Sequence, residues 1–213
     1  MNKTFEKYYK YVLPLLAYIL TPYFFEFLEL GDTITYAAKV IVTGGVVAYF
    51  WKDYKEIKLS FKHFYSGLGF GLLVFAVWVL PEVFFDMPSW YFLGEVSSFV
   101  PENILSVLIR VAGAVVIASV VEELFVRSFL NRMLISDDYE KVPIGKFTLV
   151  SFVVTVAFFG LSHNRWIVGL ITGVLLNLLL WWKKDIFVCI QAHAWANWFL
   201  AMFVILTGSF GFW

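Results

Sequence analysis

Residues 119–130 read SVVEELFVRSFL, and this stretch raises the question on which the fold and the function both depend. Two adjacent carboxylates, Glu122 and Glu123, and one guanidinium, Arg127, interrupt an apolar run that extends on both sides. A charged side chain near the centre of a membrane helix costs at least about 2.5–3.5 kcal/mol on insertion scales. If this segment lies in lipid, its three charges need a structural or a catalytic reason.

The composition indicates a membrane protein. Hydrophobic residues make up 61% of the 213 residues, aromatic residues 21% and charged residues 15%, and the mean hydropathy is +0.80. Soluble domains have about 45–50% apolar and about 25% charged residues. From this composition we expect a lipid bilayer around the protein. The net charge is zero and no basic stripe is interleaved with aromatic residues, so we expect no nucleic-acid partner.

Apolar stretches long enough to cross a bilayer recur along the chain. A spanning helix needs about 20 predominantly apolar residues, and no repeat or linker divides the sequence. We therefore predict an all-α fold: a polytopic transmembrane helical bundle of about seven spans (six to eight), forming a single integral membrane domain over residues 1–213 with a polar cavity inside the membrane. The predicted spans lie near residues 11–28, 35–51, 66–85, 104–135, 147–163, 166–182 and 186–206.

Basic residues alternate between the two ends of these spans. They gather before the first span and after the second, fourth and sixth, whereas acidic residues dominate the other loops. Because loops retained in the cytoplasm carry the excess of lysine and arginine, the pattern places the N-terminus in the cytoplasm. Lys39 and Arg110 lie within spans, and we interpret both as long side chains that extend toward the membrane interface.

The spacing within residues 119–130 separates the charges into a pair and a single group. Glu123 and Arg127 are four residues apart and share a helix face, so they can form an ion pair. Glu122 points about 100° away around the helix and has no local partner. An ion pair that locks two helices explains Glu123 and Arg127, but it leaves Glu122 as a carboxylate available for chemistry.

Polar side chains on two other spans are expected at a similar depth. His163 ends the fifth span, and His193 and Asn197 are four residues apart on the seventh. At a rise of about 1.5 Å per residue, these side chains and Glu122 all lie about 12–24 Å from the cytoplasmic turns of their helices. Each alone is typical of an interhelical hydrogen bond, but together they predict a shared polar site.

The same residues form motifs that resemble those of a known family. EELFVR (122–127), FGLSH (159–163) and HAWAN (193–197) have the order and spacing of EExxxR, FxxxH and HxxxN motifs. In these motifs the chain resembles the CPBP family of intramembrane proteases, which includes the type II CAAX prenyl endopeptidases, and more narrowly the prokaryotic CAAX prenyl protease-related proteins. The resemblance covers about residues 104–206, the expected catalytic core, and departs at Ser128, where many members have glycine.

The resemblance implies an intramembrane glutamate-type endopeptidase that needs no cofactor and lies in a prokaryotic plasma membrane. Its implied substrate is a membrane-associated peptide or lipidated protein, of CAAX type or carrying a sorting signal, and nothing in the sequence indicates an oligomeric state. The implied roles are general base for Glu122, water positioning for His163, oxyanion hole for His193 and Asn197, and a supporting ion pair for Glu123 and Arg127.

Two alternatives fit part of the pattern. Glu122, His163 and His193 would form a His₂Glu zinc set with an open fourth position, although the sequence has no HExxH motif. A non-enzymatic transporter or scaffold would also bury charges inside a bundle. Transporters commonly show paired halves, whereas the polar residues here lie in the C-terminal half.

Overall fold

The structure, a computed structural model, describes residues 3–94 and 99–213 and is built from helices. Helix accounts for 78% of it and no strand occurs in the described residues, which confirms the all-α prediction. The short helices α4, α5 and α6 and the segments between them form one continuous composite helix. The long helices are α1 (Lys3–Phe27), α2 (Asp32–Tyr49), α3 (Phe64–Phe84), the composite helix (Ile104–Met133), α7 (Leu149–Leu161), α8 (Trp166–Lys183) and α9 (Ile186–Thr207).

Four helical segments in the described residues are long and apolar enough to cross a membrane. They are Phe61–Phe84, Ile104–Met133, Trp166–Lys183 and Ile186–Thr207. Helix α7 is apolar but has 13 residues, a length of about 20 Å against a hydrocarbon core of about 30 Å. These helices fit an integral membrane protein, while the count of about seven spans and the single domain stay predictions.

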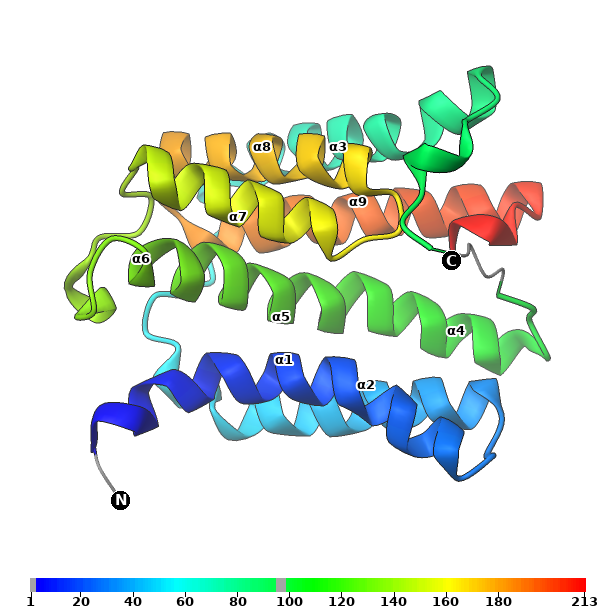
Figure 1. The fold of residues 1–213 in the computed structure, drawn as a ribbon, viewed down its shortest axis with the longest axis horizontal. Coiled ribbons are helices and arrows are strands. Elements are labelled where there is room, and N and C mark those ends of the chain that lie inside the picture. Colours follow the sequence, from blue (N-terminus) through cyan, green and yellow to red (C-terminus); the bar gives the residue numbers. More distant parts are fainter. Residues whose placement is uncertain (1–2, 95–98) are drawn as a thin grey trace.

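The helices lie side by side with their axes close to parallel or antiparallel (Figure 1). Helices α1 and α2 pack against each other on one side of the molecule, and α3 with α9 and α7 with α8 form the other side. The composite helix runs between these two groups and contacts α1 and α2 as well as α7 and α9. The stretch with the adjacent carboxylates therefore lies at the centre of the bundle.

The composite helix changes its hydrogen-bond pattern around the two carboxylates. The π-helical segments η4 (Gly113–Ala118) and η5 (Leu124–Leu130) flank α5 (Ser119–Glu123), which carries them. Such π-helical turns, with their i→i+5 hydrogen bonds, are rare and occur frequently at functional sites. At Gly113, a Cβ atom would lie 2.7 Å from Val40 on α2, so the missing side chain lets these helices approach closely.

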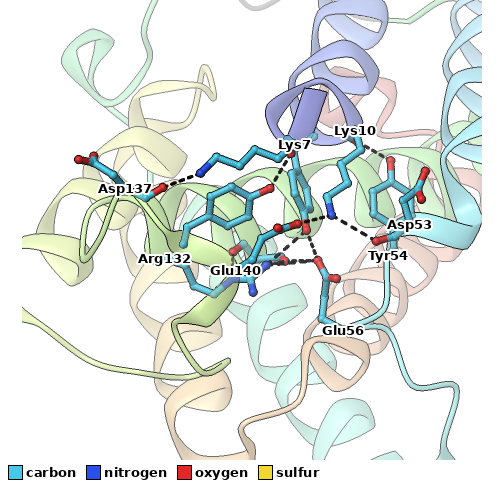
Figure 2. Close-up of polar contacts among 11 residues, drawn as sticks. Lys7, Lys10, Asp53, Tyr54, Glu56, Arg132, Asp137 and Glu140 are labelled. Carbon is cyan, nitrogen blue, oxygen red and sulfur yellow. Dashed lines mark hydrogen bonds and ion pairs between the residues drawn. The ribbon is translucent and has the colours of Figure 1, made fainter. Parts of the chain in front are cut away.

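A polar cluster ties α1 and the loop after α2 to the C-terminal end of the composite helix (Figure 2). Its centre is Glu56, which accepts hydrogen bonds from the hydroxyls of Tyr11 and Ser128. Arg132 pairs with the same carboxylate at 3.4 Å and donates to Ser128 Oγ at 2.8 Å. Ser128 is fully buried, so the side chain that departs from the family pattern is packed and hydrogen-bonded.

Candidate active site

A cavity brings the four predicted catalytic side chains together. Its volume is about 290 Å³, and its lining includes Glu122, His163, His193 and Asn197. Glu122 comes from α5, His163 from the turn after α7, and the other two from α9. The four side chains therefore line one cavity. Their depth in a membrane and their catalytic roles stay predictions.

Glu122 and His163 face each other in this cavity. Glu122 Oε2 lies 3.7 Å from His163 Nε2, and both side chains are partly exposed. The other ring nitrogen, His163 Nδ1, lies 2.6 Å from the carbonyl oxygen of Phe159. A carbonyl only accepts hydrogen bonds, so Nδ1 carries the proton and, in the neutral imidazole, Nε2 is left as an acceptor. The carboxylate and the imidazole thus present two acceptor atoms to the same small volume.

Aromatic rings hold His163 in this orientation. The ring of Trp78 meets it edge-on at 5.6 Å between centroids, and the ring of Phe159 lies 4.7 Å away. Trp78 is itself fixed, because its indole nitrogen donates to Thr172 Oγ1 at 3.0 Å. Phe159 also lies under the guanidinium of Arg127, 4.2 Å from Cζ to the ring centre. The phenylalanine of the FxxxH motif therefore contacts residues of two motifs.

Glu123 forms a second glutamate–histidine pair that is closed to solvent. Its Oε1 lies 3.1 Å from Arg127 Nη1 and 2.9 Å from His193 Nδ1. The side chains of Glu123 and Arg127 are 0% exposed, and the ion pair predicted from their spacing is present. Because a carboxylate accepts, His193 Nδ1 donates to Glu123, and no described residue hydrogen-bonds His193 Nε2.

Asn197 fastens α9 to the composite helix beside this pair. Its Nδ2 donates to the carbonyl oxygen of Ala114 at 2.7 Å and to Ser119 Oγ at 3.3 Å. Ala114 lies in the π-helical segment η4, so this bond contacts the irregular part of the composite helix. The amide that the sequence assigns to the oxyanion hole therefore lines the cavity with its donors directed at α5 and η4.

The residues of the alternative zinc set are divided between the two pairs. His163 faces Glu122, whereas His193 directs Nδ1 at Glu123. Across residues 3–94 and 99–213, no three His, Cys, Asp or Glu side chains lie close enough together to hold a metal ion.

Lys39 and Arg110 are two charged cavity residues that sequence reasoning assigned to the membrane interface. We interpreted both as side chains extending to the interface, but the structure places them in the cavity lining with Glu122. No clear signal was present in the sequence. Arg110 precedes Glu122 by twelve residues, with Ala114 and Ala118 between them, and on a regular α-helix this spacing separates the two side chains by about 120° around the axis.

The comparisons with known proteins agree with the motifs. Residues 103–199 match the family model described as Rce1-like, type II CAAX prenyl endopeptidase Rce1-like, and this segment contains all six predicted site residues. No curated protein and no solved structure matches the chain. Through residues 103–199, the chain is therefore similar to the Rce1-like type II CAAX prenyl endopeptidase family, in the segment that carries all three motifs.

Proposed function

We propose that this protein is an intramembrane endopeptidase that hydrolyses a peptide bond of a membrane-associated substrate. The family implies a protease, and with it a membrane environment and a peptide or protein substrate. The observation that carries the proposal is the 3.7 Å approach of Glu122 Oε2 to His163 Nε2 in a cavity, with the buried Glu123–His193 pair beside it.

The Glu122–His163 pair suits the activation of one water molecule. Two acceptor atoms this close match the two hydrogens of a water, which then directs a lone pair away from both side chains. A substrate carbonyl placed on that side receives the attack of the water oxygen while Glu122 takes the proton. The new C–O bond gives a tetrahedral intermediate with a negative oxygen.

Collapse of this intermediate breaks the C–N bond. The proton held by Glu122 passes to the leaving nitrogen, so the products are an amine and a new carboxylate, and the carboxylate base is regenerated. His163 Nε2 keeps the water in place before the attack. No step in this scheme requires a group that the chain does not itself supply.

His193 is the proposed donor to the oxyanion through Nε2. The hydrogen on Nδ1 of His193 is directed at Glu123. Nε2 therefore donates only when it also carries a hydrogen, which makes the imidazole cationic beside the Glu123 carboxylate. Arg127 keeps the Glu123 carboxylate in position. Asn197 contributes the N–H that is now 3.3 Å from Ser119 Oγ, the longer of its two contacts. Such donors act strongly in a site that excludes water.

The basic loops support a cytoplasmic N-terminus, and the resemblance to prokaryotic relatives is the reason that we propose a prokaryotic plasma membrane. In that orientation α2 and the composite helix begin at the outer face. Lys39 and Arg110 lie about two helical turns from those ends, and Glu122 lies further along the composite helix. The proposed polar cavity therefore extends from the outer part of the bundle toward its middle. We propose a membrane-anchored or sorting-signal peptide as the substrate. A CAAX-type lipidated peptide is the second substrate class that the cleavage assay should include.

Peptide cleavage by the purified protein in liposomes tests the proposal. Quenched fluorescent peptides, with and without a prenylated cysteine, report the rate, and mass spectrometry locates the cut bond. We expect wild type to cleave at least one class at a single bond and Glu122→Gln to leave both classes intact. Folded wild-type protein that cleaves neither class would favour the non-enzymatic alternative.

A further inference from the structure

Lys39 on α2 and Arg110 on α4 line the same cavity as the Glu122–His163 pair. Tyr36 is a neighbour of both cations: its ring centre lies 5.5 Å from Lys39 Nζ and 4.8 Å from Arg110 Cζ. Lys39 Nζ also lies 3.5 Å from the ring centre of Tyr18. The two positive charges are therefore held together against aromatic rings inside the cavity.

Neither cation has a hydrogen bond or an ion pair with any residue that the structure describes. The carboxylates whose charges act on them are Glu122 for Lys39 and Asp32 for Arg110, and both lie beyond the 4 Å of an ion pair. Cations within a membrane bundle usually pair with an anion or a carbonyl group. Contacts with ring faces offset part of the desolvation cost, and no residue in 3–94 or 99–213 accepts a hydrogen bond from the N–H donors of either side chain.

One face of the composite helix connects these cations to the predicted base. Arg110, Ala114, Ala118 and Glu122 all line the cavity. The two alanines present only methyl groups, so they add little bulk to the cavity between the ionisable residues. Twelve residues correspond to about 18 Å along the helix, a distance that about five residues of extended peptide cover.

We propose that Lys39 and Arg110 form a subsite for a carboxylate of the substrate, located within about five residues of the bond that is cut. This inference rests on the proposed function and names its substrate class: a peptide with a negative charge close to the cleaved bond, at its C-terminus or on an acidic side chain. Arginine binds a carboxylate through two parallel N–H donors, and lysine adds a compact positive charge. Lys39 lies outside the segment that matches the family model, so the N-terminal helices contribute to substrate choice.

A peptide series with one core sequence distinguishes the two sources of the carboxylate. It comprises the free C-terminal acid, the C-terminal amide, and amides with one aspartate two to five residues from the cut bond. Charged hydrogen bonds of this kind support a preference of roughly 10- to 100-fold in kcat/KM, expressed mainly in KM. Preference for the acid identifies the chain terminus, and rescue of the amide by aspartate identifies a side chain.

Variants connect that preference to the two cations. Lys39→Met and Arg110→Met remove the positive charge and keep an unbranched apolar side chain. In both variants we expect the ratio of kcat/KM for charged over uncharged peptide to fall toward one. The conservative variants Lys39→Arg and Arg110→Lys should retain most of the preference. Lys58→Met, in an exposed loop, is the matched control and should leave the ratio unchanged.

The outcomes separate this inference from the function on which it rests. Wild type that cleaves charged and uncharged peptides at equal rates overturns the carboxylate subsite, as does a preference that survives in both methionine variants. Wild type that cleaves no peptide instead contradicts the proposed function. If a methionine variant does not fold, the cleavage rates of charged and uncharged peptides by wild type decide the inference.

Discussion

His193 Nδ1 lies 2.9 Å from Glu123 Oε1, so the two adjacent glutamates of the EELFVR segment face different histidines. Neighbouring residues on a helix point about 100° apart, which directs Glu122 toward the turn after α7 and Glu123 toward α9. The two pairs differ in access: the side chain of Glu122 is 17% exposed and that of Glu123 is 0% exposed. The cavity therefore gives access to Glu122 but not to Glu123, and in the proposed function Glu123 acts through the residues that it holds.

The first prediction concerns Glu122. In Glu122→Gln the side chain keeps its size but cannot take a proton from water, so we expect peptide cleavage to fall by about 10²- to 10⁴-fold. Because the carboxylate is partly exposed, thermal unfolding in detergent should change little. The measurement is the rate per folded protein, with Glu102→Gln, an exposed glutamate before α4, as the matched control. Full activity in Glu122→Gln would show that another group is the base.

The second prediction concerns the buried ion pair. Removing either partner leaves the other charge uncompensated in the interior, so Glu123→Gln and Arg127→Met should each reduce the free energy of unfolding by about 3–5 kcal/mol. The double variant should lose less than the sum of the two, because no lone charge remains buried. Thermal unfolding in detergent measures all three.

Lys141→Met removes one partner of an exposed ion pair and is the comparison for these three variants of the buried pair. Lys141 pairs with Asp138 at 2.7 Å, but its side chain is 84% exposed. Exposed pairs contribute little to stability, so this variant should unfold like wild type. Equal effects at the exposed and the buried pair would contradict the assignment of Glu123 and Arg127 as a structural support of the site.

The third prediction concerns metal. The proposed chemistry uses side chains alone. Within the zinc set, Glu122 and His163 face each other, whereas His193 pairs with Glu123. We therefore expect cleavage to persist after dialysis against a strong chelator, with metal content measured on the same sample. Loss of activity that returns on addition of zinc would favour the zinc-peptidase alternative.

Much of the helical layout could be predicted from the sequence, for a simple physical reason. Long apolar windows bounded by charged residues give the helix ends closely: the window 186–206 corresponds to Ile186–Thr207. The prediction fails where the helix continues beyond the apolar part. Helix α1 begins at Lys3, eight residues before the predicted span, because charged residues outside the bilayer can still form helix.

The site could be predicted only in part. Spacing identifies which side chains share a helix face, and so it gave the Glu123–Arg127 pair. It does not identify partners on other helices, which is why the contact of Asn197 with Ala114 was not foreseen. The π-helical segments and the cavity positions of Lys39 and Arg110 likewise depend on packing between segments far apart in the chain.

The last prediction separates a catalytic from a structural role for Asn197. If its amide donates to the oxyanion, Asn197→Ala should lower kcat by about 100- to 1000-fold, beyond any loss of stability from the broken contact with Ala114. Asn177 on α8 offers a matched control, because it is buried, donates to Thr155 Oγ1 at 2.8 Å and does not line the cavity.

Asn177→Ala should therefore lower the unfolding temperature and leave kcat per folded protein unchanged. The comparison is informative because both asparagines join two helices and both variants remove one amide. A fall in kcat for Asn197→Ala alone assigns its donor to the reaction. Equal kcat values for the two variants would restrict Asn197 to fastening α9 to the composite helix, and His193 Nε2 would then be the remaining donor to the oxyanion.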